Sequence, residues 1–238
     1  MTVMTAPAPT ATPVRDLRTF WRVLIAVALP IGPLLVTILR GVMPYWTNDD
    51  TPTIIAKSLA HPDAMNTMAW ISLFLMPPLV ISMLAIGYVA RRGAPVLATI
   101  GATISFLAYV NWSVAGNTDL MVHTAGQKGI DPDTINRFID ATQNNAIAGI
   151  STFGWVIGHI LGMVLLGIAL LRARAVPRWV AIALMVSQPM HLVSAVIVPS
   201  RLLDVTLGWG LTTVAFTAVA VVILRTRNDD WDLPPAVR

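Results

Sequence analysis

Cysteine and glutamate are both absent from this chain of 238 residues. Without cysteine there are no disulfides, thiolate nucleophiles, iron–sulfur clusters or cysteine-bound zinc ions, and nothing can be inferred about the redox compartment. Without glutamate, the helical metal motifs HExxH and ExxH are excluded. The familiar metal sites of helical proteins are therefore missing, and we expect no resident metal or other cofactor.

Charged residues are also scarce. They make up 12% of the sequence, against about a quarter in an ordinary soluble domain, while hydrophobic residues make up 55% and the mean hydropathy is +0.70. The pI of about 10.1 reflects cations spread over short connecting segments rather than one basic face or tail, so nucleic acid is not an expected partner. The composition predicts an integral membrane protein whose surroundings are membrane lipid.

Six apolar stretches are each long enough to cross a bilayer, which takes roughly 20 helical residues for about 30 Å of hydrocarbon. They cover residues 21–39, 65–89, 94–115, 149–171, 179–198 and 205–224. We therefore predict an all-α, polytopic membrane protein in which residues 15–227 form a six-helix bundle. Residues 1–14 are rich in Thr, Ala and Pro and are predicted to be disordered, and residues 228–238 are predicted to form a cytoplasmic tail.

Arginines mark one side of the predicted bundle. They lie before the first stretch, in alternate links and after the last stretch, as Arg15, Arg18, Arg22, Arg91, Arg92, Arg172, Arg174, Arg178, Arg225, Arg227 and Arg238. The other side holds Arg40, Lys57, Lys128, Arg137 and Arg201, which we place in loops together with most of the aspartates. By the positive-inside rule we expect a multi-pass protein of the cytoplasmic membrane with both termini cytoplasmic.

The two longer loops on the outer side each contain the start of a short helix. Thr51-Pro52 begins one and Asp131-Pro132 begins the other, because proline is favoured in the first turn of a helix. We expect two short extracytoplasmic helices that lie as lids over the outer ends of the membrane helices.

The fourth stretch carries a packing motif. Gly154, Gly158 and Gly162 recur every four residues and line one helix face, and small residues at that spacing let two membrane helices approach closely. The partner is either another helix of this chain, which we favour, or a second copy, which would make the protein a homo-oligomer.

His159 and His191 are the candidate functional residues. An ionisable side chain inside a membrane helix is costly to insert and is a functional candidate by default. At ~1.5 Å per residue, His159 lies about 16 Å below Gly149 and His191 about 12 Å below Pro199. The sequence therefore predicts that the two imidazoles converge in the outer half of the bundle, as candidates for catalysis.

Other polar and aromatic residues have comparable depths and complete a predicted ligand-binding chamber. Its members are Asn111, Trp112, Trp155, His159, Gln188, His191 and Trp209. Imidazole can carry a proton or bond a carbonyl, and tryptophan faces attract cationic or electron-poor groups. In the alternative interpretation the tryptophans mark the membrane interface and the histidines bond neighbouring helices. A haem or metal ion between the two histidines is a further alternative, although the ligands for a metal are few.

Part of the chain resembles a known family. The run from Gly158 to Leu170, the sequence LLRARAVPRWVAIAL and its Val176-Pro177-Arg178-Trp179 turn are similar to the closing half of a bacterial six-helix membrane family of unknown function. The resemblance covers about a third of the chain. It implies the architecture of the bundle and no activity.

Three functions are compatible with this pattern. The first is a binding or sensing protein that holds a lipid-like or small hydrophobic molecule in the outer half. The second is a membrane-embedded enzyme acting on an isoprenoid, a quinone or a related lipid, as in cyclase-type acid–base chemistry, against which stands the absence of a carboxylate from the predicted membrane helices. The third is a small transporter, although no internal repeat is evident. The sequence leaves open whether the chain is an enzyme.

Overall fold

The computed structural model of the chain describes residues 15–112 and 117–233. Within these residues the structure is helical and contains no strand, so the predicted all-α class is confirmed. The predicted N-terminal tail lies outside the described residues, as do the last residues of the predicted third stretch and the end of the C-terminal tail.

Six long helical segments are apolar enough to cross a membrane. The first four are α1 (Arg18–Val42), α3 (Pro62–Ala90), α4 (Pro95–Trp112) and α7 (Ala146–Ala173). The fifth is α8 (Arg178–Leu192), which continues as a π-helical segment, η2 (Val193–Ile197). The sixth consists of α9 (Arg201–Leu203), a second π-helical segment, η3 (Asp204–Gly208), and α10 (Trp209–Arg225). The chain is thus a multi-pass helical membrane protein.

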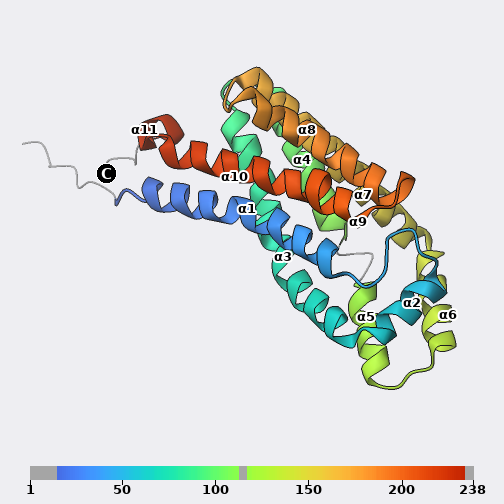
Figure 1. The fold of residues 1–238 in the computed structure, drawn as a ribbon. Helices are drawn as coiled ribbons and strands as arrows, with labels where there is room; N and C mark the ends of the chain where they lie inside the picture. Colours follow the sequence, from blue (N-terminus) through green and yellow to red (C-terminus); the bar gives the residue numbers. More distant parts are fainter. Residues whose placement is uncertain (1–14, 113–116, 234–238) are drawn as a thin grey trace, which may run out of the picture.

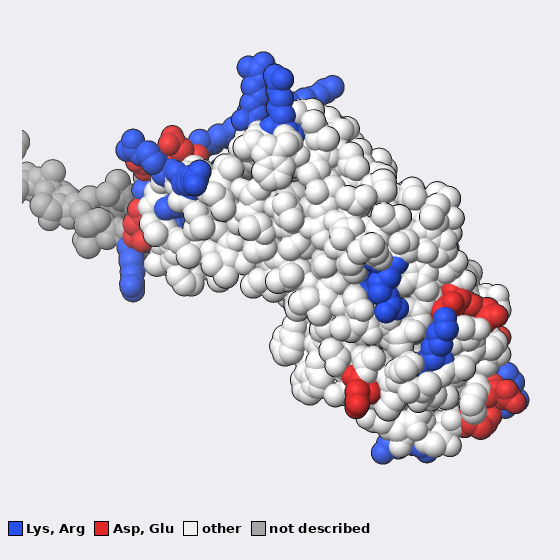
Figure 2. Space-filling model, in the orientation of Figure 1, with Lys and Arg blue, Asp and Glu red and all other residues white. Residues whose placement is uncertain are grey.

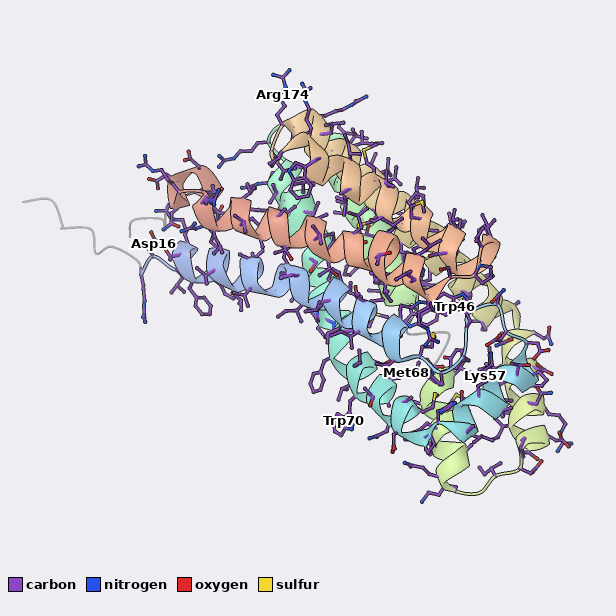
Figure 3. All side chains as sticks on the ribbon, in the orientation of Figure 1. Asp16, Trp46, Lys57, Met68, Trp70 and Arg174 are labelled. Carbon is purple, nitrogen blue, oxygen red and sulfur yellow. The ribbon has the colours of Figure 1, made fainter. Side chains whose placement is uncertain are left out.

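The six membrane helices form a closed ring. α1 packs between α3 and α10, α4 packs between α3 and α7, and α8 packs between α7 and α10 (Figure 1). Their inward side chains build one continuous apolar core, in which the fully buried members include Leu29, Met83, Leu166, Leu184 and Phe216. Large apolar side chains also point outward, as Trp70 does on α3 (Figure 3), because lipid surrounds the ring.

Three short helices gather at the end of the bundle away from the described ends of the chain (Figure 1). These are α2 (Thr51–Ala60), α5 (Thr118–Gln127) and α6 (Pro132–Gln143). The side chains of Asp50 and Asp131 accept hydrogen bonds from Thr53 N and Thr134 N, which caps α2 and α6 at the predicted positions. Sequence reasoning missed α5, which has no proline in its first turn and is capped by the Asn117 side chain.

Charge is concentrated at the two ends of the molecule. Figure 2 shows basic side chains, with acidic ones beside them around α11 (Asn228–Trp231), at the end that also holds the α7–α8 turn, and charges of both signs at the end with the short helices. The band between them carries almost no charged side chains on the face shown (Figure 2). This distribution fits a bundle whose middle lies in hydrocarbon.

The glycine face of α7 packs against α4. A Cβ atom on Gly158 would lie 2.8 Å from Ala108 Cβ, and one on Gly162 would lie 2.9 Å from the backbone nitrogen of Ser105. Gly154 is looser, because its nearest neighbour is the Asn111 side chain at 3.8 Å. The face at Gly158 and Gly162 therefore packs against a helix of the same chain, the partner that we favoured.

Candidate functional site

Asp204 is the centre of the buried polar site. It begins η3 and has no solvent exposure. One carboxylate oxygen accepts a hydrogen bond from His191 Nδ1 at 2.6 Å and a longer one from Ser194 Oγ at 3.3 Å. The other oxygen accepts from Arg40 Nε at 2.5 Å. A buried carboxylate thus lies between a guanidinium group and an imidazole.

Two sequence-based expectations are wrong here. We expected no carboxylate in a membrane helix, and we placed Arg40 among the loop cations. The sixth membrane segment in fact begins at Arg201 and includes Asp204, and Arg40 lies in the last turn of α1 with 6% exposure. The two charges neutralise each other inside the bundle. In the sequence, each charge by itself marks the end of an apolar stretch, so neither was predicted to lie within the membrane.

Irregular backbone surrounds this site. His191 lies in the last turn of α8, directly before η2, and Asp204 opens η3. π-Helical turns are rare and often occur at functional sites. Gly208 makes the close approach possible, since a Cβ atom there would lie 2.6 Å from Asp204 Oδ1 and 3.2 Å from His191 Cβ. Gly208 was not predicted as a site residue. Its only signal in the sequence is its position directly before the candidate residue Trp209.

The tautomer of His191 follows from its partner. A carboxylate only accepts hydrogen bonds, so His191 Nδ1 carries a proton and the Nε2 lone pair is free in the neutral ring. His159 is arranged in the same way, because its Nδ1 bonds the backbone oxygen of Trp155 at 2.7 Å. Both rings therefore keep Nε2 for another partner, and the Nε2 of His159 is buried without one.

The two imidazoles lie together, as their depths predicted. Their ring centroids are 6.0 Å apart. His159 stacks on Trp155 at 4.6 Å, and Trp155 in turn lies 4.2 Å from Trp112. Trp209 packs 6.5 Å from His159 and 5.6 Å from His191. The structure thus joins the two histidines and the three candidate tryptophans in one aromatic cluster between α4, α7, α8 and α10.

Tyr109 belongs to the same cluster and was missed. Its ring lies 6.4 Å from that of His159, and it comes from α4, where no periodic pattern distinguishes it from other apolar residues. Its hydroxyl group is buried without a hydrogen-bond partner among the described residues, as is Trp155 Nε1. Buried polar atoms normally have partners, so a water molecule or a ligand is the expected partner of these two atoms.

Asn111 and Gln188 lie at helix contacts. Gln188 is buried and donates from Nε2 to Thr212 Oγ1 at 2.8 Å, which links α8 to α10. Asn111 is exposed, and its backbone oxygen accepts a hydrogen bond from Ser151 Oγ. The part of Asn111 in a ligand-binding chamber stays a prediction.

Comparison of the chain with protein-family models, curated proteins and solved structures finds no match. The resemblance of residues 158–184 to a bacterial six-helix family therefore adds no residue roles. The assignment of roles depends on the geometry of the site.

For a metal or haem, the site offers the Nε2 atoms of His159 and His191. No group of three or more His, Cys, Asp or Glu side chains among the described residues is placed to hold a metal ion. Asp204, the nearest carboxylate, already bonds His191 and Arg40. The same two nitrogen atoms are equally suited to bind an organic molecule through hydrogen bonds.

Proposed function

We propose that this membrane protein binds a lipid-like or small hydrophobic molecule beside His159 and His191 and exchanges a proton with it. The observation that carries the proposal is the fully buried Asp204, which accepts hydrogen bonds from His191 Nδ1 and Arg40 Nε. This pairing supplies the carboxylate that we had considered missing from an acid–base mechanism. It supports the enzyme interpretation more strongly than the sequence did.

His191 is the proposed acid–base group. When its Nε2 takes a proton, the ring becomes positive next to the Asp204 carboxylate, which compensates the new charge where little water is present. When Nε2 gives the proton to the ligand, the ring returns to its neutral form with Nδ1 still bonded. Arg40 keeps the carboxylate in place through both states. This is the role that a carboxylate has beside a catalytic histidine in general.

The unpaired polar atoms define the ligand chemistry. Trp155 Nε1 is a donor, His159 Nε2 is an acceptor in the neutral ring, and the Tyr109 hydroxyl group can do both. A molecule that satisfies them carries a carbonyl or hydroxyl group on an apolar body. Isoprenoid alcohols and quinones have this composition, and the aromatic faces of the cluster fit their apolar parts.

Binding without proton transfer is the second candidate function. It is favoured by the unpaired atoms of His159, Trp155 and Tyr109, which a ligand can satisfy without any chemistry. In that case the protein holds or senses the molecule, and a partner transmits the signal. The two functions differ in whether a proton moves when the ligand binds.

The first prediction separates these roles. Purified protein in nonionic detergent is titrated with farnesol and with a short-chain ubiquinone, and tryptophan fluorescence is followed. The His159→Phe variant keeps an aromatic ring but lacks Nε2, so we expect about tenfold weaker binding, equivalent to roughly 1.4 kcal/mol. The exposed His61 has no side-chain hydrogen bond among the described residues, and the control variant His61→Gln is expected to bind as the wild type does. Equal binding by His159→Phe would remove the proposed site.

Proton exchange is measured by calorimetry in two buffers of different ionisation enthalpy. We expect the wild type to take up or release protons on binding and the His191→Gln variant to bind the same probe without doing so, because glutamine cannot titrate. If His191→Gln still exchanges protons on binding, His191 is not the acid–base group. If the wild type binds the probe without exchanging protons, the acid–base role is contradicted and the binding function remains.

We also propose that both termini are cytoplasmic and that α2, α5 and α6 lie outside the cell. The distribution of arginines supports this orientation. Because the chain lacks cysteine, single cysteines report their surroundings cleanly. Lys128→Cys is expected to react with a membrane-impermeant maleimide in intact cells, and Arg172→Cys only after the membrane is opened. The reverse pattern would invert the proposed topology.

A further inference from the structure

A second polar cluster lies at the end of the bundle that carries the short helices. Trp46 follows α1 in the chain, and Figure 3 shows it near that end, where α2 also lies. The guanidinium carbon of Arg40 lies 4.1 Å from the Trp46 ring centroid, and that of Arg201 lies 5.8 Å from it. One indole ring thus has two cations beside it.

This cluster contains hydrogen-bond donors without acceptors. Arg40 donates from Nε to Asp204 and from Nη1 to Thr47 Oγ1 at 2.7 Å. Arg40 is only 6% exposed, so water cannot readily reach it. Its Nη2 is buried and has no hydrogen-bond partner among the described residues. Trp46 Nε1 is likewise buried without a partner. Both groups only donate, so the missing partner is an acceptor.

The charges near Trp46 favour an anion as this acceptor. Arg201 bonds the backbone oxygens of Gly41 and Met43 and forms no ion pair among the described residues. Lys57 is already paired with Asp49 at 2.7 Å. Arg40 is paired with Asp204, so both of these carboxylates are already in use, and the exposed Arg201 has no carboxylate partner among the described residues.

One further carboxylate, Asp119, lies near the cluster. It accepts a hydrogen bond from the Tyr45 hydroxyl group. Burial raises the pKa of Asp119, against the opposing effects of the Tyr45 hydrogen bond and the Arg40 charge, and so favours its neutral form. Asp119 forms no ion pair with Arg201 among the described residues.

We propose that Arg40, Trp46 and Arg201 bind the anionic head group, a phosphate or carboxylate, of an amphipathic molecule. Guanidinium groups suit both anions, because their planar array of N–H groups matches the oxygen atoms. This inference deepens the proposed function and rests on it for the place of the apolar part, since Asp204 joins Arg40 to His191. The ligand class becomes an anionic amphiphile whose head lies at Trp46 and whose body extends toward the imidazoles.

The test uses the full chain in nanodiscs of phosphatidylcholine with a minor fraction of phosphatidylglycerol, and native mass spectrometry counts the lipids retained. The wild type is expected to retain phosphatidylglycerol preferentially. Trp46→Phe removes one donor but keeps the ring, and Arg201→Gln removes the charge that has no carboxylate partner. Each is expected to lower this preference about 5- to 10-fold. Lys128→Gln, which removes an exposed cation from the end of α5, is the matched control and is expected to leave the preference unchanged.

Inorganic phosphate distinguishes a head group from a free ion. If phosphate displaces the lipid only at concentrations far above that of the lipid, the ligand is an amphiphile, because its apolar tail then contributes to binding. Equal affinity for phosphate and the lipid overturns the amphiphile and leaves an ion site. Unchanged retention in both Trp46→Phe and Arg201→Gln overturns the head-group site. The His159→Phe variant distinguishes a failure of the head-group site from a failure of the proposed function. It alters the imidazole pair and leaves Arg40, Trp46 and Arg201 in place.

Discussion

The Asp204→Ala variant is expected to lose about 3–5 kcal/mol of stability, because removing the carboxylate leaves Arg40 buried without its charge partner. His191 Nδ1 and Ser194 Oγ lose an acceptor at the same time. For a chain of this size the loss corresponds to a fall in Tm of roughly 10 °C. Thermal unfolding is measured in detergent on the protein fused to a fluorescent protein. Size-exclusion chromatography after heating gives the fraction that remains folded.

Two further variants isolate the cause of this loss. Asp133→Ala removes an exposed carboxylate in the first turn of α6 and is expected to leave Tm within about 2 °C, since isolated surface charges contribute little. The double variant Arg40→Met with Asp204→Asn removes both charges and is expected to recover most of the stability, because a buried ion pair replaced as a unit costs little. A wild-type Tm for Asp204→Ala would show that the carboxylate does not hold α1, α8 and η3 together.

The sequence predicted the membrane helices well because the constraint is local. A helix that crosses hydrocarbon needs about 20 consecutive apolar residues, and each such stretch can be recognised without knowledge of its neighbours. The starts of α2 and α6 were predictable for the same reason, since Pro52 and Pro132 each mark a first helical turn locally. The depths of His159 and His191 also follow from counting residues along each helix separately.

Asp204 and Arg40 could not be recognised in this way. They are 164 residues apart in the chain, and each ends an apolar stretch, where a charge normally marks the membrane boundary. Only the ring of helices, which brings α1 beside α10, shows that the two charges compensate each other. The π-helical segments were equally hidden, because nothing in the residues 193–197 and 204–208 differs from ordinary helical sequence.

The carboxylate inside the membrane changes the functional interpretation of the two histidines. Without a carboxylate in the membrane, the two histidines suggested binding more than chemistry. With Asp204 beside His191, the same histidines form an ordered pair in which only one ring has a carboxylate partner. That asymmetry is the physical basis for assigning proton transfer to His191 and ligand hydrogen bonding to His159.

The Gly162→Ala variant is expected to destabilise the protein by about 1–3 kcal/mol, because the new methyl group overlaps α4. Its Cβ atom would lie 2.9 Å from Ser105 N and 3.1 Å from Ser105 Cα, and backbone atoms cannot rotate away as a flexible side chain does. The helices must separate instead. Gly149→Ala is the matched control on the same helix, since a Cβ atom there has no neighbour within 4 Å. It is expected to be neutral or to raise Tm slightly, because alanine has the higher helix propensity.

Separation of α4 from α7 also reaches the candidate site. Tyr109 and Trp112 come from α4, whereas Trp155 and His159 come from α7, and the rings of Trp112 and Trp155 lie only 4.2 Å apart. We therefore expect Gly162→Ala to weaken the binding of farnesol or ubiquinone as well as to lower Tm, and Gly149→Ala to change neither by more than the small propensity effect. If Gly162→Ala lowered Tm and left binding intact, the aromatic cluster would be structural, and the ligand contacts would have to come from α8 and α10 alone.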